Sequence, residues 1–130
     1  MTANIKRLEK LINSELTSKV QSSSIQNGEL LITINENNLI EVLQFLKSND
    51  NCKFKQLIDI AGVDYPNEEK RFELVYLLLS HEKNLRLKIS IKFQLNQIIN
   101  SITKIFPSAN WMEREVFDMY GIKFKNHPDL

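Results

Sequence analysis

The sequence predicts an α+β fold in two layers, a mixed or mostly antiparallel sheet of about five strands with helices packed on one face. The strongest observation is residues 85–93, where apolar residues alternate with Arg, Lys and Ser, because a period of two buries one face of a strand and leaves the other polar. A second apolar segment, residues 72–79, precedes it closely enough to form a hairpin. Helical spacing of apolar residues occurs both before and after these strands, as an α+β chain requires.

Length and composition indicate a single globular domain, 1–130. A chain of 130 residues has the commonest size of a folding unit and can bury one core. The net charge of +1 creates no global field that would attract nucleic acid or anionic lipid, so we expect no nucleic-acid partner. The longest apolar run covers only residues 74–79, whereas a helix needs roughly 20 residues to cross a bilayer. The first residues do not resemble a secretory signal, so we expect the protein to stay where it is made.

Cys52 and His81 are isolated residues that could carry chemistry, but neither has the partners that a catalytic or metal site requires nearby in the sequence. Cys52 is the only cysteine, which excludes an internal disulfide and a four-thiolate iron–sulfur site within the chain. It stands in a polar turn with no histidine near it in the sequence, so we interpret it as an incidental thiol. His81 lies in a polar loop without clustered ligand partners and is expected to be a surface residue.

The N-terminal part is expected to contain a helix, a hairpin and a second helix. Residues 4–17 place apolar side chains at three- and four-residue spacing, which predicts an amphipathic helix. The Asn-Gly dipeptide within residues 20–34 accepts positive φ at both central turn positions, so this segment is predicted to be a hairpin. Asn35 can cap the next helix, whose apolar stripe runs along residues 36–48.

A third strand and a third helix complete the middle of the chain. Residues 54–63 are apolar enough for a largely buried strand, which the turn residues at 64–67 terminate. After the hairpin of strands 72–79 and 85–93, isoleucine and phenylalanine recur at helical spacing over residues 96–106. That spacing predicts a short helix, stopped by Pro107.

The last segment, NWMEREVFDMYGIKFKNHPDL, is predicted to form a helix, a short strand and a turn. Asn110 and Glu113 match a capping box that would start the helix at Trp111. Gly121 supplies the left-handed residue that ends it. Residues 122–125 alternate like a strand, and the Asn-His-Pro-Asp sequence that follows is typical of a turn.

An active site is one interpretation of this segment. Glu113 and Glu115 are two positions apart and point roughly 200° from each other around a helix, so they cannot easily share a substrate as paired catalytic carboxylates do. His127 and Asp129 offer two ligands, whereas a metal site needs at least three. A stand-alone hydrolase that uses Glu113 or Glu115 is therefore the less favoured alternative.

A docking surface is the interpretation that the residue types favour. Trp, Tyr and Arg dominate the energetics of protein interfaces, because they bury a large area and keep a polar group. Arg114 and Asp118 are four positions apart and can pair across one helical turn. An ordinary capped core helix would give the same pattern, and it stays open as an alternative.

The same residues resemble the 30 kDa subunit, also called the C-type subunit, of the proton-pumping NADH-quinone oxidoreductase known as respiratory complex I. The family pattern reads approximately N-W-x-E-R-E-x-x-D-x-(F/Y)-G-(I/V)-x-F-x-G-H-P-D-L. Upstream, LIDIAGVDYP and RFELVYLLLS resemble the block that precedes it, so the likeness covers residues 54–130 well and the earlier residues only in layout. The matching positions are Asn110, Trp111, Glu113, Arg114, Glu115, Asp118, Tyr120, Gly121, Ile122, Phe124, His127, Pro128, Asp129 and Leu130.

The resemblance implies a non-catalytic scaffold in the hydrophilic arm of the complex, on the cytoplasmic side of a bacterial inner membrane or the matrix side of a mitochondrial one. It implies that this chain binds no cofactor or metal, while FMN and Fe-S clusters in partner subunits carry electrons from NADH to quinone. The implied partners are the large quinone-side subunit (49 kDa or D-type) and neighbouring Fe-S subunits, with membrane contact only through the complex. The isolated chain would self-associate through its exposed docking face. The residues implied to anchor it are Trp111, Glu113, Arg114, Glu115, Asp118, Tyr120, Gly121, His127, Pro128 and Asp129.

Two departures from the family pattern affect these expectations. The glycine before the histidine is Asn126 here, which also accepts a left-handed backbone. The sequence stops at Leu130, where family members continue with a tail that wraps a neighbouring subunit, so a C-terminal truncation is expected. Equivalent subunits of a membrane-bound hydrogenase or of the plastid-type oxidoreductase carry similar motifs and are the alternative.

Overall fold

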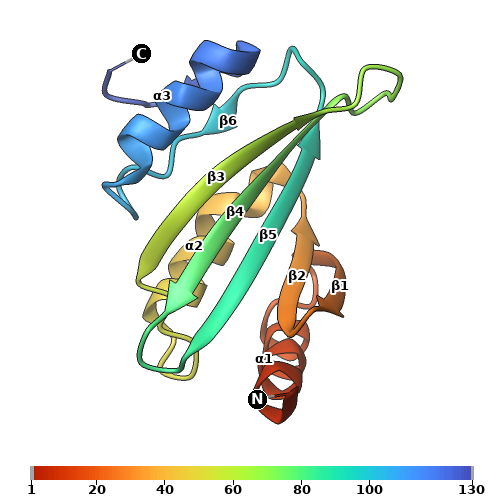
Figure 1. The fold of residues 1–130 in the computed structure, drawn as a ribbon, viewed down its shortest axis with the longest axis vertical. Helices are drawn as coiled ribbons and strands as arrows, with labels where there is room; N and C mark the ends of the chain where they lie inside the picture. The colour runs from red at the N-terminus through yellow and green to blue at the C-terminus, as the bar shows by residue number, and fades with distance from the viewer. Residues whose placement is uncertain (1, 130) are drawn as a thin grey trace.

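The computed structural model describes residues 2–129, with side chains described from Asn4 onward, and its elements are shown in Figure 1. No helix in this described part is long and apolar enough to span a bilayer. In chain order the elements are α1 (Thr2–Glu15), β1 (Val20–Gln26), β2 (Glu29–Ile34), the 3-10 turn η1 (Glu36–Asn38), α2 (Leu39–Ser48), β3 (Gln56–Asp64), β4 (Phe72–Ser80), β5 (Leu85–Phe93), β6 (Ile99–Asn100), α3 (Ala109–Tyr120) and β7 (Phe124–Lys125).

A mixed five-stranded sheet forms one layer, in the order β1-β2-β5-β4-β3. Its neighbours are antiparallel except for β2 and β5, which run parallel. Helix α2 lies behind this sheet in Figure 1, and apolar residues of α1 and α2 join one core with the buried face of the strands. The predicted α+β fold with a mixed sheet is therefore confirmed. A second, two-stranded parallel sheet joins β6 to β7.

Buried side chains alternate with more exposed ones along the central strands β4 and β5, and the buried ones form part of the core. Leu74, Tyr76 and Leu78 of β4 are buried and pair with buried residues of β5 on the same face. The other face of β5 is polar, as its sequence predicts, with Arg86 and Lys92 exposed. Ser90 is the exception, because it is buried and donates a hydrogen bond to the carboxylate of Glu73 on β4.

Local signals near the N-terminus act as predicted, with one difference at the second helix. Asn27 and Gly28 both have positive φ, 53° and 78°, and connect β1 to β2 in the predicted hairpin. The side chain of Asn35 accepts a hydrogen bond from the Asn37 amide at 2.9 Å. This contact caps the 3-10 turn η1, so the segment predicted as one helix over residues 36–48 begins with a tighter turn before α2.

The prediction of a helix over residues 96–106 is wrong. The segment instead contains the two-residue strand β6, followed by irregular turns. The Ile99 amide donates to the carbonyl of Lys123, just before β7, at 3.1 Å, and the Ser101 amide donates to the carbonyl of Lys125, within β7, at 2.9 Å. These partners from the end of the chain replace intrahelical ones, while Ile102 is still buried in the core. The helical spacing of apolar residues in this segment therefore indicates which side chains are buried, although the backbone is not helical.

Tyr76→Phe is expected to raise the free energy of unfolding by about 1 kcal/mol. Within the described residues the Tyr76 hydroxyl is buried without a hydrogen-bond partner, so removing it relieves a desolvation cost while the ring keeps its packing. Urea unfolding of both proteins measures the difference. Tyr65→Phe is the matched control, because the Tyr65 hydroxyl donates to Glu73 at 2.8 Å and its loss should not stabilise. A Tyr76→Phe variant less stable than the parent would contradict this expectation.

Candidate functional site

Helix α3 carries the candidate site and packs along the edge strand β3. It begins at Ala109, earlier than predicted, after an N-cap residue, Ser108, whose side chain makes no capping hydrogen bond. The predicted capping box is therefore wrong, and Asn110 instead donates from its side chain to Asp129 at 3.0 Å. The predicted end is confirmed, because Gly121 is left-handed at φ 74° and its amide donates to the Phe117 carbonyl at 2.8 Å.

Glu113 is a buried structural residue and not part of the exposed surface. It is 0% exposed, and its two carboxylate oxygens accept from the Ser101 hydroxyl at 2.6 Å and the Ile102 amide at 2.8 Å. Burial raises the pKa of Glu113, while these two hydrogen bonds and the nearby His127 act in the opposite direction. The carboxylate fastens the irregular segment after β6 to helix α3.

His127 has a similar internal role in the turn that follows β7. One ring nitrogen, Nε2, bonds the Asn110 carbonyl at 2.8 Å, and Nδ1 accepts from the Asp129 amide at 3.0 Å. Because Nδ1 accepts, Nε2 is the nitrogen that donates to the Asn110 carbonyl. The side chain is buried beside Glu113, with 3.9 Å between Nε2 and Oε1. Asn126 before it has φ 68°, the left-handed backbone that its sequence position predicts.

Tyr120 locks the C-terminal end of α3 onto the sheet. Its hydroxyl donates to the carbonyl of Gly62 on β3 at 3.0 Å, and its ring meets the ring of Phe72 edge-on at a centroid distance of 6.2 Å. A Cβ at Gly62 would lie 2.6 Å from the Tyr120 ring. The glycine is therefore what allows the aromatic ring to approach the strand.

The outer face of α3 presents two large apolar side chains among charges. Trp111 is 55% exposed and Met119 is 72% exposed. Between them lie Arg114, Glu115 and Asp118, all exposed and within about 100° of Trp111 around the helix axis. The expected pair between Arg114 and Asp118 is not among the ion pairs of residues 2–129. We refer to the exposed residues 111, 114, 115, 118 and 119 as the outer face of α3.

The predicted site residues thus fall into two groups. The structure buries the side chains of Glu113 and His127 and half-buries Tyr120 as internal contacts. It leaves exposed Trp111, Arg114, Glu115, Asp118, Gly121, Pro128 and Asp129.

The two less favoured interpretations, a carboxylate active site and a metal site, gain no support from this geometry. Glu113 is buried and hydrogen-bonded while Glu115 is exposed, so the two carboxylates do not share a cleft. Within residues 2–129 no group of three or more His, Cys, Asp or Glu side chains lies close enough together to hold a metal ion.

Two residues that matter for the site, Ser101 and Gly62, are missing from the sequence prediction. Ser101 lies in the segment mistaken for a helix, and nothing in its local sequence indicates a carboxylate twelve positions later. Gly62 did leave a signal, because a glycine inside a strand marks a close approach by another group.

Residues 32–130 match the family described as respiratory-chain NADH dehydrogenase, 30 Kd subunit. The chain belongs to this family. Its motif residues therefore include both the internal contacts of α3 and the exposed outer face of α3.

Curated relatives are bacterial proteins named as the C-type subunit of NADH-quinone oxidoreductase. The Mesorhizobium japonicum protein is 40% identical over 130 residues, which is 100% of this chain and 65% of that protein. The Rhodospirillum rubrum protein is 42% identical over 127 residues, 98% of this chain and 60% of the relative. The chain thus spans less than two thirds of the length of these relatives.

Two solved structures share the fold. A trypsin-resistant fragment (1-134) of Nqo5 superposes with a TM-score of 0.80 at 27% identity and covers 95% of this chain and 99% of the fragment. A chain of the membrane-bound sulfane sulfur reductase, an archaeal respiratory membrane complex, has a TM-score of 0.83 at 22% identity, covering 96% of this chain and 72% of that one. The second similarity shows the fold alone.

Gly62→Ala is expected to lower the free energy of unfolding by about 1–3 kcal/mol, the usual cost of overpacking. The new methyl group would overlap the Tyr120 ring at 2.6 Å and displace the hydroxyl from the Gly62 carbonyl. Chemical denaturation of a double-mutant cycle with Tyr120→Ala measures the coupling. The alanine should cost much less once the ring is absent, and an equal cost in both backgrounds would contradict the steric explanation.

Glu113→Gln is expected to flatten the pH dependence of stability. The folded-state pKa of Glu113 is raised above its usual 4.5. Between pH 4.5 and the raised pKa, the folded chain therefore holds a proton on Glu113 that the unfolded chain has released. The stability from this group is therefore full below pH 4.5 and is lost as the pH rises through the raised value. Urea unfolding at a series of pH values measures the slope. Glu115→Gln, exposed on the other side of α3, is the control that should leave the slope unchanged. An unchanged slope in Glu113→Gln would contradict this assignment.

Proposed function

We propose that this chain is a non-catalytic scaffold subunit in the hydrophilic arm of a proton-translocating NADH-quinone oxidoreductase. Membership of the 30 Kd subunit family is the observation that carries this proposal. In this proposal FMN and Fe-S clusters in partner subunits pass electrons from NADH to quinone. The chain contributes position and not chemistry, and residues 1–130 act as one domain.

The outer face of α3 is the proposed docking surface. Trp111 and Met119 offer exposed apolar area, and tryptophan and arginine are among the residues enriched in interface hot spots. Arg114 and Asp118 are exposed on the same face, where they can pair with charges of the partner. Pro128 and Asp129 are also exposed and belong to the proposed contact.

Glu113, His127 and Tyr120 support the same surface from inside. Their hydrogen bonds to Ile102, Asn110 and Gly62 fix the rotation of α3 about its own axis. Because Trp111 is two positions from Glu113, burying the carboxylate turns the indole outward. These three residues are proposed to position the interface rather than to contact the partner.

The proposed partners are the large quinone-side subunit and the neighbouring Fe-S subunits. The chain would then meet the membrane only through the assembled complex, on the cytoplasmic face of a bacterial inner membrane. An exposed tryptophan and methionine on one helix also provide a surface through which isolated copies would self-associate.

Trp111→Ala and Arg114→Ala are expected to reduce recovery of the complex by at least about tenfold in a pull-down, because hot-spot truncations typically cost about 2 kcal/mol or more. The tagged chain, carried in its full-length form, is expressed in its host and recovered from gently solubilised membranes. Mass spectrometry quantifies the large quinone-side subunit and the flavin and Fe-S subunits.

Arg86→Ala is the matched control, because Arg86 is an exposed arginine on β5, away from α3. Its recovery of partner subunits should equal that of the parent protein. Full recovery with both α3 variants would refute this docking surface while leaving the scaffold role intact. Recovery of nickel-bearing hydrogenase subunits, or of no respiratory subunit at all, would refute the assignment to this complex.

A further inference from the structure

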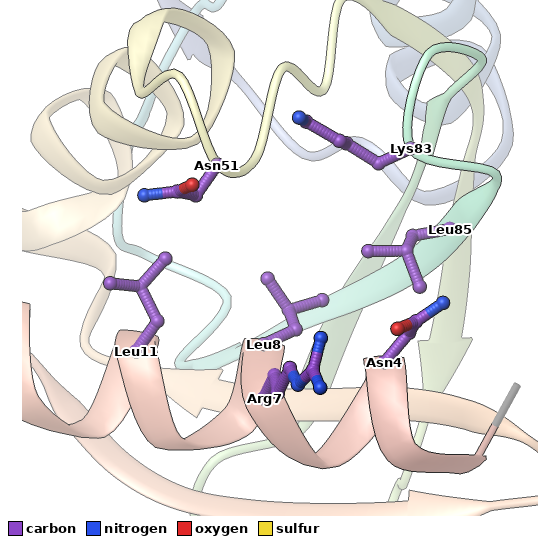
Figure 2. A pocket seen from close by; sticks show the side chains of 7 residues that line it. All are labelled: Asn4, Arg7, Leu8, Leu11, Asn51, Lys83 and Leu85. Carbon is purple, nitrogen blue, oxygen red and sulfur yellow. The ribbon is translucent and has the colours of Figure 1, made fainter.

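A hollow of about 410 Å³ lies at the opposite end of the molecule from α3. Three parts of the chain enclose it, as Figure 2 shows: one face of α1, the turn after α2 and the turn from β4 into β5. Its size falls within the range of small-molecule sites. None of the residues that line it belongs to the proposed docking surface, so the hollow has no part in the function proposed above.

The floor of the hollow is apolar. Leu8 and Leu85 are nearly buried, with 3% and 8% exposed, and Leu11 lies beside them on the next turn of α1. Leu8 and Leu85 belong to the main core, so the floor is fixed by packing. An aliphatic group placed on these leucines would remove apolar area from water.

The walls carry two cations without anionic partners. Neither Arg7 nor Lys83 is among the ion pairs of residues 2–129, although Glu82 beside Lys83 is already paired with Lys53 at 3.3 Å. Figure 2 shows the Lys83 side chain extending over the hollow toward Asn51, with Arg7 on the opposite wall. Among the described side chains no acidic residue lines this hollow, so its walls are positive.

Lys83 also lies near the buried thiol of Cys52. Burial raises the pKa of the Cys52 thiol to about 11, and the charge of Lys83 opposes that rise. The charge of Lys83 therefore acts on the buried thiol of Cys52, the residue next to Asn51. Lys83 is half-buried, so an anion that reached it would meet a partly desolvated charge.

A second space of about 500 Å³ shares Asn4, Lys83 and Leu85 with the hollow. Ile5 and Ile25 supply apolar side chains there, and Arg86 adds another cation. Its one acidic residue among those described, Glu29, is paired with Lys88 at 3.4 Å. We refer to the two spaces together as the groove, whose lining combines apolar side chains with the cations Arg7, Lys83 and Arg86.

We propose that this groove binds an alkyl carboxylate, with the carboxylate between Arg7 and Lys83 and the alkyl chain along Leu8, Leu85 and Ile5. A carboxylate has two oxygens and can accept hydrogen bonds from a guanidinium and an ammonium group together. The leucines favour a ligand with an alkyl chain, because a small hydrophilic anion would leave the apolar floor uncovered. Amide side chains of Asn4 and Asn51 complete the polar wall around the head group.

The test is a titration of the isotope-labelled 130-residue chain with decanoate, below its micellar concentration, followed by backbone amide NMR. Saturable shifts are expected at Leu8, Lys83 and Leu85. Arg7→Gln and Lys83→Gln should each weaken binding about tenfold, the effect of losing one charge-assisted hydrogen bond. Both residues are on the surface of the fold, and unchanged amide dispersion confirms that each variant is folded.

Matched controls separate the two parts of the proposal. Lys6→Gln removes the same charge from the neighbouring position of α1, outside the groove, and should leave decanoate binding unchanged. Decyltrimethylammonium keeps the alkyl chain but carries a cationic head group, and acetate keeps the carboxylate but lacks the long alkyl chain. Each should bind at least about tenfold more weakly than decanoate. Equal binding of either control ligand, equal weakening by Lys6→Gln, or no saturable shift with decanoate would overturn the proposal.

Discussion

The buried carboxylate of Glu113 is the constraint on which the C-terminal part of this molecule depends. The chain after β6 is irregular, so its amides have few regular partners, and the Ile102 amide is satisfied by a side chain from α3. The same oxygen pair also receives the Ser101 hydroxyl. Holding Glu113 inward fixes the rotation of the helix, and the exposure of Trp111 on its other side follows from helical geometry.

Much of the fold could be predicted because its signals are local. The Asn27-Gly28 turn and the alternation of residues 85–93 each specify their own backbone. Two predictions failed where a distant partner decided the outcome. The apolar residues of segment 96–106 have helical spacing, but the amides of Ile99 and Ser101 donate to the carbonyls of Lys123 and Lys125. Asn110 and Glu113 match a capping box, yet their side chains bond Asp129 and the segment after β6.

The site was only partly predictable, because one motif serves two purposes. Charged and aromatic residues look alike in a sequence whether they support a helix from inside or cover its outer face. Periodicity held the necessary information, since Glu113 shares the inner face with Met112 and Val116, whereas Trp111, Glu115 and Asp118 lie opposite them. Gly62 could not be connected with Tyr120 from the sequence, because their contact joins residues far apart in the chain.

The parallel pairing of β2 with β5 also constrains how the chain can reach this structure. The N-terminal hairpin finds its neighbour in the sheet only in β5, a strand made much later during synthesis. Helix α1 and the hairpin therefore emerge from the ribosome with an uncovered apolar face that stays open until Phe93 is available. Local pairing of β4 with β5 can proceed first, and closure of the long β2–β5 loop then becomes the slow step. Nascent chains that stop before β5 are the form most exposed to aggregation and proteolysis.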